Sequence, residues 1–223
     1  MSPRILAASL LALASAASTG HAEPSSLVAF DAPTRALLAS ADAARGKETA
    51  AGSKCNKCHG ADGISQDPED PSLAGQRASY TFKELMDYKS KHRDDTNMFK
   101  KVRSLDNQQL ADMAAWYASL PLPPSAKAAE ASAATQRLVF KGDPKRMLKP
   151  CASCHGRGGE GSQRDSAAIT SLRRSYFIAT MQAFKTEDRT NDVYSRMRLI
   201  AAALTDEEIR GLADYYAMAN EEK

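Results

Sequence analysis

The sequence predicts an all-α protein built from two similar helical domains in tandem. The 223-residue chain repeats itself: a shift of 96 residues places Tyr80 on Tyr176, and after a three-residue insertion a shift of 99 places Leu105 on Leu204. The stretches 80–88 and 176–184 carry apolar residues at helical spacing, and no segment alternates as a strand would. Such a repeat indicates a duplicated structural unit.

The first 22 residues read as an export signal that is removed from the mature chain. Arg4 supplies a positive start, residues 5–17 are apolar, and small residues precede the cleavage that we expect after Ala22. The apolar stretch is too short to span a bilayer, and no later window of about 18 apolar residues exists. We therefore expect a periplasmic protein without a transmembrane segment; peripheral contact with a membrane stays open.

The mature sequence divides into four parts. Residues 23–41 form an N-terminal extension whose role the sequence does not reveal, and residues 42–119 form the first domain. Residues 120–136 are rich in Pro, Ala and Ser, which is typical of a linker. Residues 137–223 form the second domain.

Within the helix expected at 80–88, Lys83 and Glu84 are predicted to face solvent.

Capping residues mark several helix starts. Two capping boxes and one further start are expected, at Asp106 with Gln109, at Thr205 with Glu208, and at Asp143 with Pro144.

Every cysteine of the chain belongs to one of two C-x-x-C-H motifs, the attachment signature of c-type haem. On one helical turn the two cysteines can form thioethers with the porphyrin, and the next histidine then lies under the iron. A buried porphyrin also supplies core that so small a domain lacks. The sequence predicts two covalently bound haem c groups, with thioethers at Cys55, Cys58, Cys151 and Cys154 and proximal ligands at His59 and His155.

Other uses of these cysteines fit less well. A zinc ribbon places its two C-x-x-C pairs about 15–20 residues apart, whereas 92 residues separate these two. A thioredoxin-type dithiol needs a βαβ context, which the sequence does not offer. A disulfide within each pair would close too small a loop to stabilise much.

Methionine is the expected sixth ligand of each iron. Met98 and Met197 occupy the same place in the repeat, seven residues before the leucine at the start of the last helix. His92 competes with Met98 at the first haem, as do Lys100 and Lys101. The remaining methionines of the mature chain are expected to fill core space: Met86, Met113, Met147, Met181 and Met218.

Net charge restricts the function little. Without Arg4 the chain has 29 basic and 27 acidic side chains, so nothing indicates a nucleic-acid partner. Residues 23–118 carry 13 basic and 14 acidic side chains, and residues 137–223 carry 15 and 12. The resulting mild dipole can orient the molecule at a partner.

These features resemble class I cytochromes c, which share the C-x-x-C-H-G start, a distal methionine and a terminal helix with an aromatic pair. The tandem arrangement, with the runs 71–76 (PSLAGQ) and 189–192 (RTND), resembles the dihaem cytochrome c4 family over nearly all of the mature chain. The resemblance implies two tandem class I cytochrome c domains, each wrapped around one haem c. It also implies that Gly46 and Gly142 let the first helix of each domain cross closely over the last.

The chain departs from the family pattern in both halves. The first half has 93–97 (RDDTN) where the second has its Arg-Thr-Asn-Asp run. The second half reads 167–172 (AAITSL), so it lacks the proline whose carbonyl commonly holds the proximal histidine.

An iron ligated by His and Met has no site for substrate, and Met ligation raises its potential. We therefore expect an electron carrier and not an enzyme. The resemblance to the cytochrome c4 family implies a quinol–cytochrome c reductase or dehydrogenase as donor and a terminal oxidase as acceptor. One alternative is a small dihaem oxidoreductase of the thiosulfate dehydrogenase or peroxidase type. Another is the electron-accepting subunit of a dehydrogenase complex, at which only the extension 23–41 hints.

Overall fold

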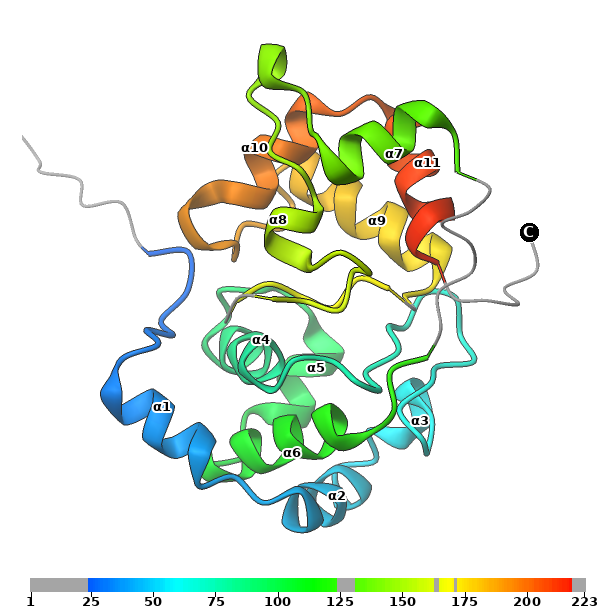
Figure 1. Ribbon diagram of the computed structural model, residues 1–223. Coiled ribbons are helices and arrows are strands. Elements are labelled where there is room, and N and C mark those ends of the chain that lie inside the picture. The colour runs from blue at the N-terminus through cyan, green and yellow to red at the C-terminus, as the bar shows by residue number, and fades with distance from the viewer. Residues whose placement is uncertain (1–23, 124–130, 163–164, 171, 218–223) are drawn as a thin grey trace, which may run out of the picture.

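The structure, a computed structural model, describes residues 24–123, 131–162, 165–170 and 172–217. The expected signal at 1–22 and Met218 lie outside these ranges. Two helical domains stack on each other, the first in the lower and the second in the upper half of Figure 1. In the described ranges the only β pairing is two isolated bridges, Asp143–Leu148 and Leu172–Ala217. The predicted all-α class is confirmed.

The first domain has a helix where the sequence predicts one, since the stretch 80–88 lies inside α4. The capping box of Asp106 with Gln109 is present at the start of its last helix. Its helices are α2 (Ala43–Gly52), α3 (Asn56–His59), α4 (Ala78–Ser90), α5 (Thr96–Val102) and α6 (Asn107–Ser119).

The second domain repeats this order with one change at its start. The capping box of Thr205 with Glu208 is present, but Asp143 caps only a short 3₁₀ turn, and the first α-helix precedes it. That helix begins at Ala133, inside the segment expected to be linker. The elements are α7 (Ala133–Phe140), η2 (Pro144–Arg146), α8 (Ala152–His155), α9 (Arg174–Lys185), η3 (Val193–Ser195), α10 (Arg196–Ala203) and α11 (Asp206–Tyr216).

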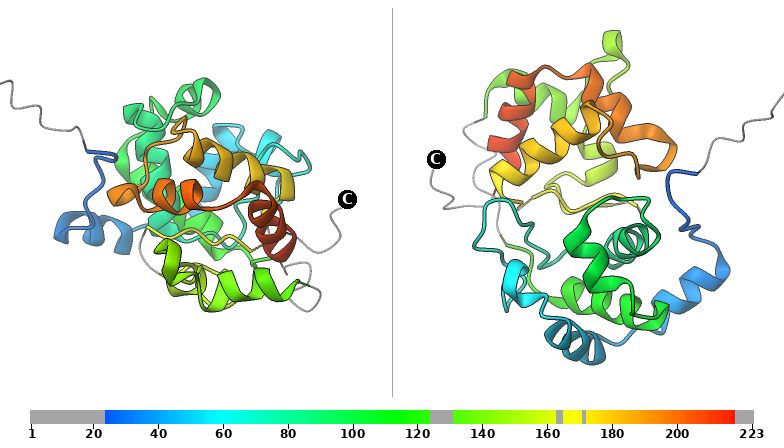
Figure 2. Two further views of the ribbon diagram at one scale, coloured as in Figure 1. Left: turned by 90° about the horizontal axis from the view of Figure 1, so that it is seen from above. Right: turned by 180° about the vertical axis from the view of Figure 1, so that it is seen from behind.

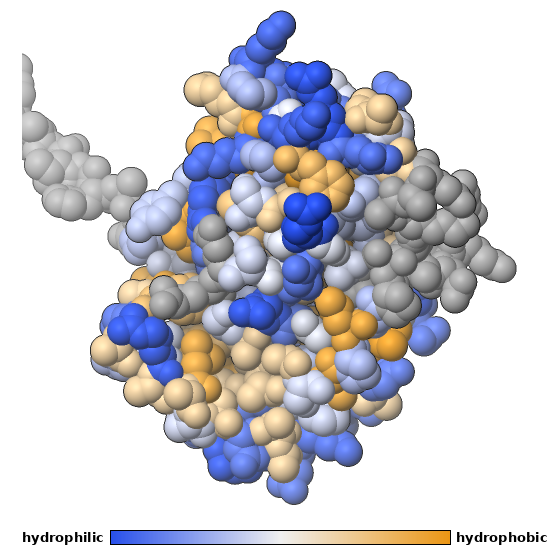
Figure 3. Space-filling model, viewed as in Figure 1, coloured by the Kyte–Doolittle hydropathy of each residue, from blue (hydrophilic) through white to orange (hydrophobic). Residues whose placement is uncertain are grey.

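Each domain has its own hydrophobic core, built mainly by the last helix and the helix after the haem motif. Leu110 and Ala114 of α6 are fully buried with Phe82 of α4. In the second domain Ile209 of α11 packs in the same cluster as Phe177 of α9. The outer surface in Figure 3 is mostly hydrophilic, and apolar residues interrupt it in small groups. In each domain the helices therefore direct apolar side chains inward, where a buried cofactor can pack against them.

A glycine allows the first and last helices to touch in each domain, but not at the expected pair of positions. A Cβ on Gly46 would lie 1.9 Å from the carbonyl oxygen of Asp112, so α2 crosses α6 here in backbone contact. The prediction for Gly142 is wrong: this residue follows α7 in the left-handed region (φ +67°) and lies against the carbonyl of Leu148. In the second domain Gly211 of α11 lies against Thr135 of α7 instead. Both domains therefore keep the contact between first and last helix, but the glycine lies on the first helix in one domain and on the last helix in the other.

Residues 24–41, whose role the sequence does not reveal, run along the junction of the two domains and onto the first. Ser25 Oγ donates to the carbonyl of Asp192 at 2.8 Å, and Ser26 Oγ donates to Asp87 Oδ1 at 2.6 Å. The chain then forms α1 (Ala32–Ala39), and Leu37 packs on the core of the first domain. Figure 1 shows this segment in blue beside both domains. It therefore fastens the second domain to the first.

The domains meet through α4 and α9, and their contacts are reciprocal. Arg93 donates to the hydroxyl of Tyr176 at 3.0 Å, and Arg189 donates to the hydroxyl of Tyr80 at 3.1 Å. Both pairs join positions that the 96-residue shift superimposes, with the domains exchanged. The two domains are therefore related by an approximate two-fold axis. The right-hand view of Figure 2 shows the stacked domains from behind.

The charged side chains of α4 are buried in this junction. Lys83 and Glu84, predicted to face solvent, are only 2% and 6% exposed. Lys83 Nζ donates to Asp87 Oδ2 at 2.6 Å and to the carbonyl of Asn191 in the other domain at 2.7 Å. The prediction is wrong because the second domain covers the face of α4 that a single domain would expose to water.

Candidate haem sites

Each C-x-x-C-H motif forms a short helix with its histidine held from behind. His59 Nδ1 lies 2.9 Å from the carbonyl oxygen of Pro71, and His155 Nδ1 lies 2.8 Å from that of Ala167. A proton on Nδ1 leaves the Nε2 lone pair for an iron, and the carbonyl fixes the ring. The second domain thus keeps this hydrogen bond without a proline, since any residue offers a backbone carbonyl.

Electrostatics favour the neutral histidine that a metal requires. Burial lowers the pKa of His59 and of His155, although the backbone carbonyl beside each ring opposes the shift. Burial also raises the pKa of Cys55, and that of Cys151 to about 11. At neutral pH the Cys55 and Cys151 thiols are therefore protonated, and both imidazoles are neutral.

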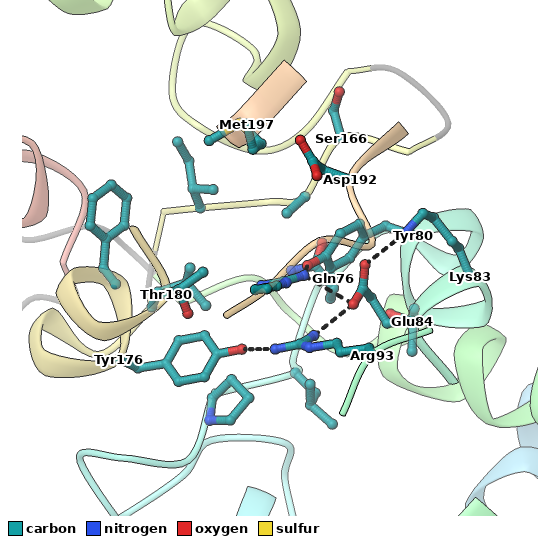
Figure 4. A pocket seen from close by; sticks show the side chains of 18 of the residues that line it. Gln76, Tyr80, Lys83, Glu84, Arg93, Ser166, Tyr176, Thr180, Asp192 and Met197 are labelled. Carbon is teal, nitrogen blue, oxygen red and sulfur yellow. Dashed lines mark hydrogen bonds and ion pairs between the residues drawn. The ribbon is translucent and has the colours of Figure 1, made fainter. Parts of the chain in front are cut away.

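A single cavity of about 600 Å³ runs between the domains and reaches both motifs. Its walls include every site residue named from the sequence: Cys55, Cys58, His59, Met98, Cys151, Cys154, His155 and Met197. Figure 4 shows its middle, where Tyr176, Arg93 and Glu84 of the junction meet and Met197 lies across from them. The sites of the two domains are therefore parts of one interior space.

The lining fits a haem. In the described part of the chain, Thr81 Oγ1 and the Tyr216 hydroxyl are buried side-chain atoms without a hydrogen-bond partner, and both residues line this cavity. Such orphaned polar atoms are rare in a finished interior and indicate a missing group. Over the same ranges, no cluster of three or more His, Cys, Asp or Glu side chains could hold a bare metal ion. The donor set suits an iron that brings its own macrocycle.

Both methionines lie on backbone that their neighbours fix. Asp95 Oδ1 accepts hydrogen bonds from the backbone N–H groups of Asn97 and Met98 at 2.8 and 2.9 Å, which holds the start of α5. Met197 follows Tyr194 and Ser195, whose φ angles of +58° and +55° turn the chain sharply before α10. Met98 and Met197 are both partly buried and packed against their domain's core.

The competing donors of the first domain are placed differently. His92 does not line the haem cavity; it lies in a separate surface hollow, with its Nδ1 2.9 Å from Ser90 Oγ. Lys101 reaches the cavity wall, but its Nζ donates to the carbonyl of Ser53 at 3.2 Å. Lys100 does not line the cavity. This arrangement favours Met98.

The remaining methionines are not all core residues. Met113 and Met181 are buried as expected, and Met86 packs partly buried on the first core. Met147 is 90% exposed, so the expectation that it fills core space is wrong. It lies just after η2 with a φ of +57°, where the turn directs its side chain outward.

Sequence reasoning missed the charged cluster between the sites. Glu84, Arg93 and Arg189 all line the cavity, and Arg93 and Arg189 stack over Tyr88 and Phe184, with the guanidinium carbons 4.7 and 4.5 Å from the ring centres. Tyr88 and Phe184 are superimposed by the same 96-residue shift. The repeat therefore contained the signal: arginine and aromatic residues recur together in both halves.

The fold and the haem motifs define a cytochrome c, and residues 43–121 match the family model described as cytochrome c. The chain is 34% identical to cytochrome c4 of Thiocapsa roseopersicina over 170 residues, which cover 75% of this chain and 88% of that protein. The crystal structure of reduced recombinant cytochrome c4 from Pseudomonas stutzeri superimposes with a TM-score of 0.74 at 28% identity, over 81% of this chain and all of that one. The chain belongs to the cytochrome c4 family.

A second relative is named for the protein from which it accepts electrons. The chain is 30% identical over 167 residues to a thiosulfate dehydrogenase electron acceptor of Stutzerimonas stutzeri, covering 73% of this chain and 77% of that protein. The name of that protein states that it accepts electrons from a thiosulfate dehydrogenase. This chain is accordingly a c-type electron carrier and not an enzyme. None of the helices described here is long and apolar enough to cross a membrane.

Proposed function

We propose that the protein is a periplasmic dihaem cytochrome that passes single electrons between respiratory proteins. One haem c is attached at Cys55 and Cys58, and the other at Cys151 and Cys154. The iron ligands are His59 with Met98 in the first domain and His155 with Met197 in the second. The observation that supports this proposal is a cavity lined by all eight residues proposed to hold the two haems.

The chain contributes fixed geometry to this task. A bound haem c supplies an iron that gains and loses one electron. The carbonyls of Pro71 and Ala167 hold the two imidazoles in place, so neither ring turns when the charge changes. Asp95 holds the backbone at Met98. A ligand set that stays in place keeps reorganisation small, which favours fast electron exchange.

Haem attachment is tested on exported protein by intact mass spectrometry. We expect a mass increase of two haems, and of one haem in the double variant Cys55→Ala/Cys58→Ala, with the second domain still coloured. A protein that carries no haem, or one that carries zinc, would end the proposal.

The distal ligands are tested by ferric-state absorption spectroscopy. Each of Met98→Ala and Met197→Ala is expected to remove one of two Met-to-iron charge-transfer bands and to lower the potential of that haem. His92→Ala is the matched control in the first domain, and we expect an unchanged spectrum because His92 lies off the cavity. The reverse pattern, with an effect of His92→Ala and none of Met98→Ala, would assign His92 to the iron.

The partners divide into two candidates. The cytochromes c4 among the relatives support a carrier between a quinol–cytochrome c reductase and a terminal oxidase. The thiosulfate dehydrogenase electron acceptor supports a carrier dedicated to a dehydrogenase. Stopped-flow reduction with each donor separates them, because the physiological donor reduces the protein fastest. Oxidation of thiosulfate by the isolated protein would instead support the enzyme alternative.

A further inference from the structure

The junction of the two domains departs from its own symmetry at several positions of α4, and Glu84 is one of them. Arg93 and Arg189 each have a counterpart in the other domain, as do Tyr80 and Tyr176. Glu84 does not, because the 96-residue shift places Thr180 opposite it. A strict repeat would have two carboxylates for the two guanidinium groups, and this chain has one.

Glu84 serves both domains at once. Its Oε2 atom accepts from Arg93 Nη1 at 2.6 Å and from Arg189 Nη2 at 3.0 Å. Asn191 Nδ2 donates to the same oxygen at 3.0 Å, and Lys83 Nζ donates to Oε1 at 3.1 Å. Both carboxylate oxygens are therefore engaged, with partners from each side of the junction.

The carboxylate is ionised despite its burial. Burial alone would raise the pKa of Glu84, but the charges of Arg189, Lys83 and Arg93 outweigh it and hold that pKa far below its usual range. The nearby ionisable groups of both domains are Lys83, Arg93, Arg189, Asp87 and the phenols of Tyr80 and Tyr176. The cluster thus contains three cationic side chains and two carboxylates, those of Glu84 and Asp87.

This charge lies on the wall of the cavity that contains both ligand sets. A fixed negative charge near an iron favours the oxidised, more positive state and so lowers the potential. In an interior of low dielectric the effect acts over longer distances than in water. Without Glu84, Arg93 and Arg189 would face the two sites with no shared counter-charge.

We propose that Glu84 is a positioning residue for electron transfer: it anchors Arg93 and Arg189 and, as their single shared counter-charge, lowers the potentials of both haems together. The inference rests on the two haem sites proposed above. Because one atom, Oε2, serves an arginine from each domain, its effect is common to the two haems and not confined to the domain that contains it.

The test is a spectroelectrochemical titration of the exported, two-haem protein. Glu84→Gln keeps the size and one acceptor oxygen but removes the charge, and we expect both midpoint potentials to rise. Thr180→Glu places a second carboxylate at the counterpart position on the cavity wall, and we expect both potentials to fall. The two variants act in opposite directions. If Glu84→Gln yields no folded protein, Thr180→Glu still tests whether a carboxylate on this wall moves both potentials together, and a shift of one potential alone would overturn the inference.

Asp112→Asn is the matched control. Asp112 is also a buried carboxylate of the first domain paired with an arginine, with its Oδ2 2.7 Å from Arg45 Nε, but it does not line the cavity. We expect it to lower stability and leave both potentials in place. A shift confined to the first haem, no shift in either variant, or an equal shift in the control would overturn the inference. Haem counting by mass tests the two-haem proposal separately, since two haems with unmoved potentials would refute only the role of Glu84.

Discussion

Replacing Gly46 by Ala should loosen the first domain by forcing its first and last helices apart. The added Cβ would lie 1.9 Å from the carbonyl oxygen of Asp112 and 2.4 Å from its carbon, where ordinary contacts begin at 3.4 Å. The helices α2 and α6 must therefore separate by about 1.5 Å. The obstacle is backbone in a helix whose side chains Leu110 and Ala114 are fully buried, so neither helix can yield without opening the core.

The size of the effect follows from two opposing terms. Overpacking against backbone costs about 3 kcal/mol, and the better helix propensity of Ala returns about 1 kcal/mol. We expect a net loss of about 2 kcal/mol, which lowers the melting temperature of a protein of this size by about 4–8 °C.

Thermal unfolding of the haem-loaded protein, followed by circular dichroism, measures this loss. Gly52→Ala is the control, because Gly52 ends the same helix and a Cβ there meets nothing within 4 Å. It should keep or slightly raise the melting temperature. If Gly46→Ala were as stable as Gly52→Ala, the close crossing of α2 and α6 would be refuted.

Three further outcomes are expected. Gly211→Ala should cost less than Gly46→Ala in the same melting experiment, because its Cβ meets only the rotatable Thr135 hydroxyl at 2.8 Å. Asp112→Asn should destabilise the protein at neutral pH by about 1–3 kcal/mol. Burial opposes ionisation here, but the hydrogen bond from Arg45 prevails and the pKa of Asp112 is lowered from 3.8. The wild-type advantage is thus complete above pH 3.8 and is lost as pH falls through the lowered folded-state pKa, which urea titrations at several pH values measure. Deleting residues 23–41 should lower the melting temperature and speed proteolysis at the junction, and an unchanged protein would show that the segment fastens nothing.

The residues that line the candidate haem sites were predictable because they belong to short motifs or recur at the same place in the repeat. Both C-x-x-C-H segments and both methionines line the cavity, as the repeat predicts. The capping boxes before α6 and α11 were readable for the same reason, since each depends on residues three positions apart. Features that depend on residues close together in the sequence can be recognised from the sequence.

The errors arise where a distant part of the chain decides. Lys83 and Glu84 look like an exposed face of a helix until a second domain covers them. The acceptor at His155 is a backbone carbonyl, which has no signature in sequence, so the missing proline was a poor guide. Gly142 aligned with Gly46 along the chain, but in the second domain the small residue at the helix crossing is Gly211. A residue-by-residue alignment of the two halves does not show that the glycine lies on the first helix in one domain and on the last helix in the other.

The reciprocal pairing of Arg93 with Tyr176 and of Arg189 with Tyr80 has a consequence for the order of the domains. A two-fold relation makes the path from the end of the first domain to the start of the second equal to the return path from the end of the second to the start of the first. A circularly permuted gene, with the second domain leading and the same linker length behind it, should therefore rebuild the junction unchanged. In such a molecule the segment 24–41, which now contacts both domains, would need a new place to attach.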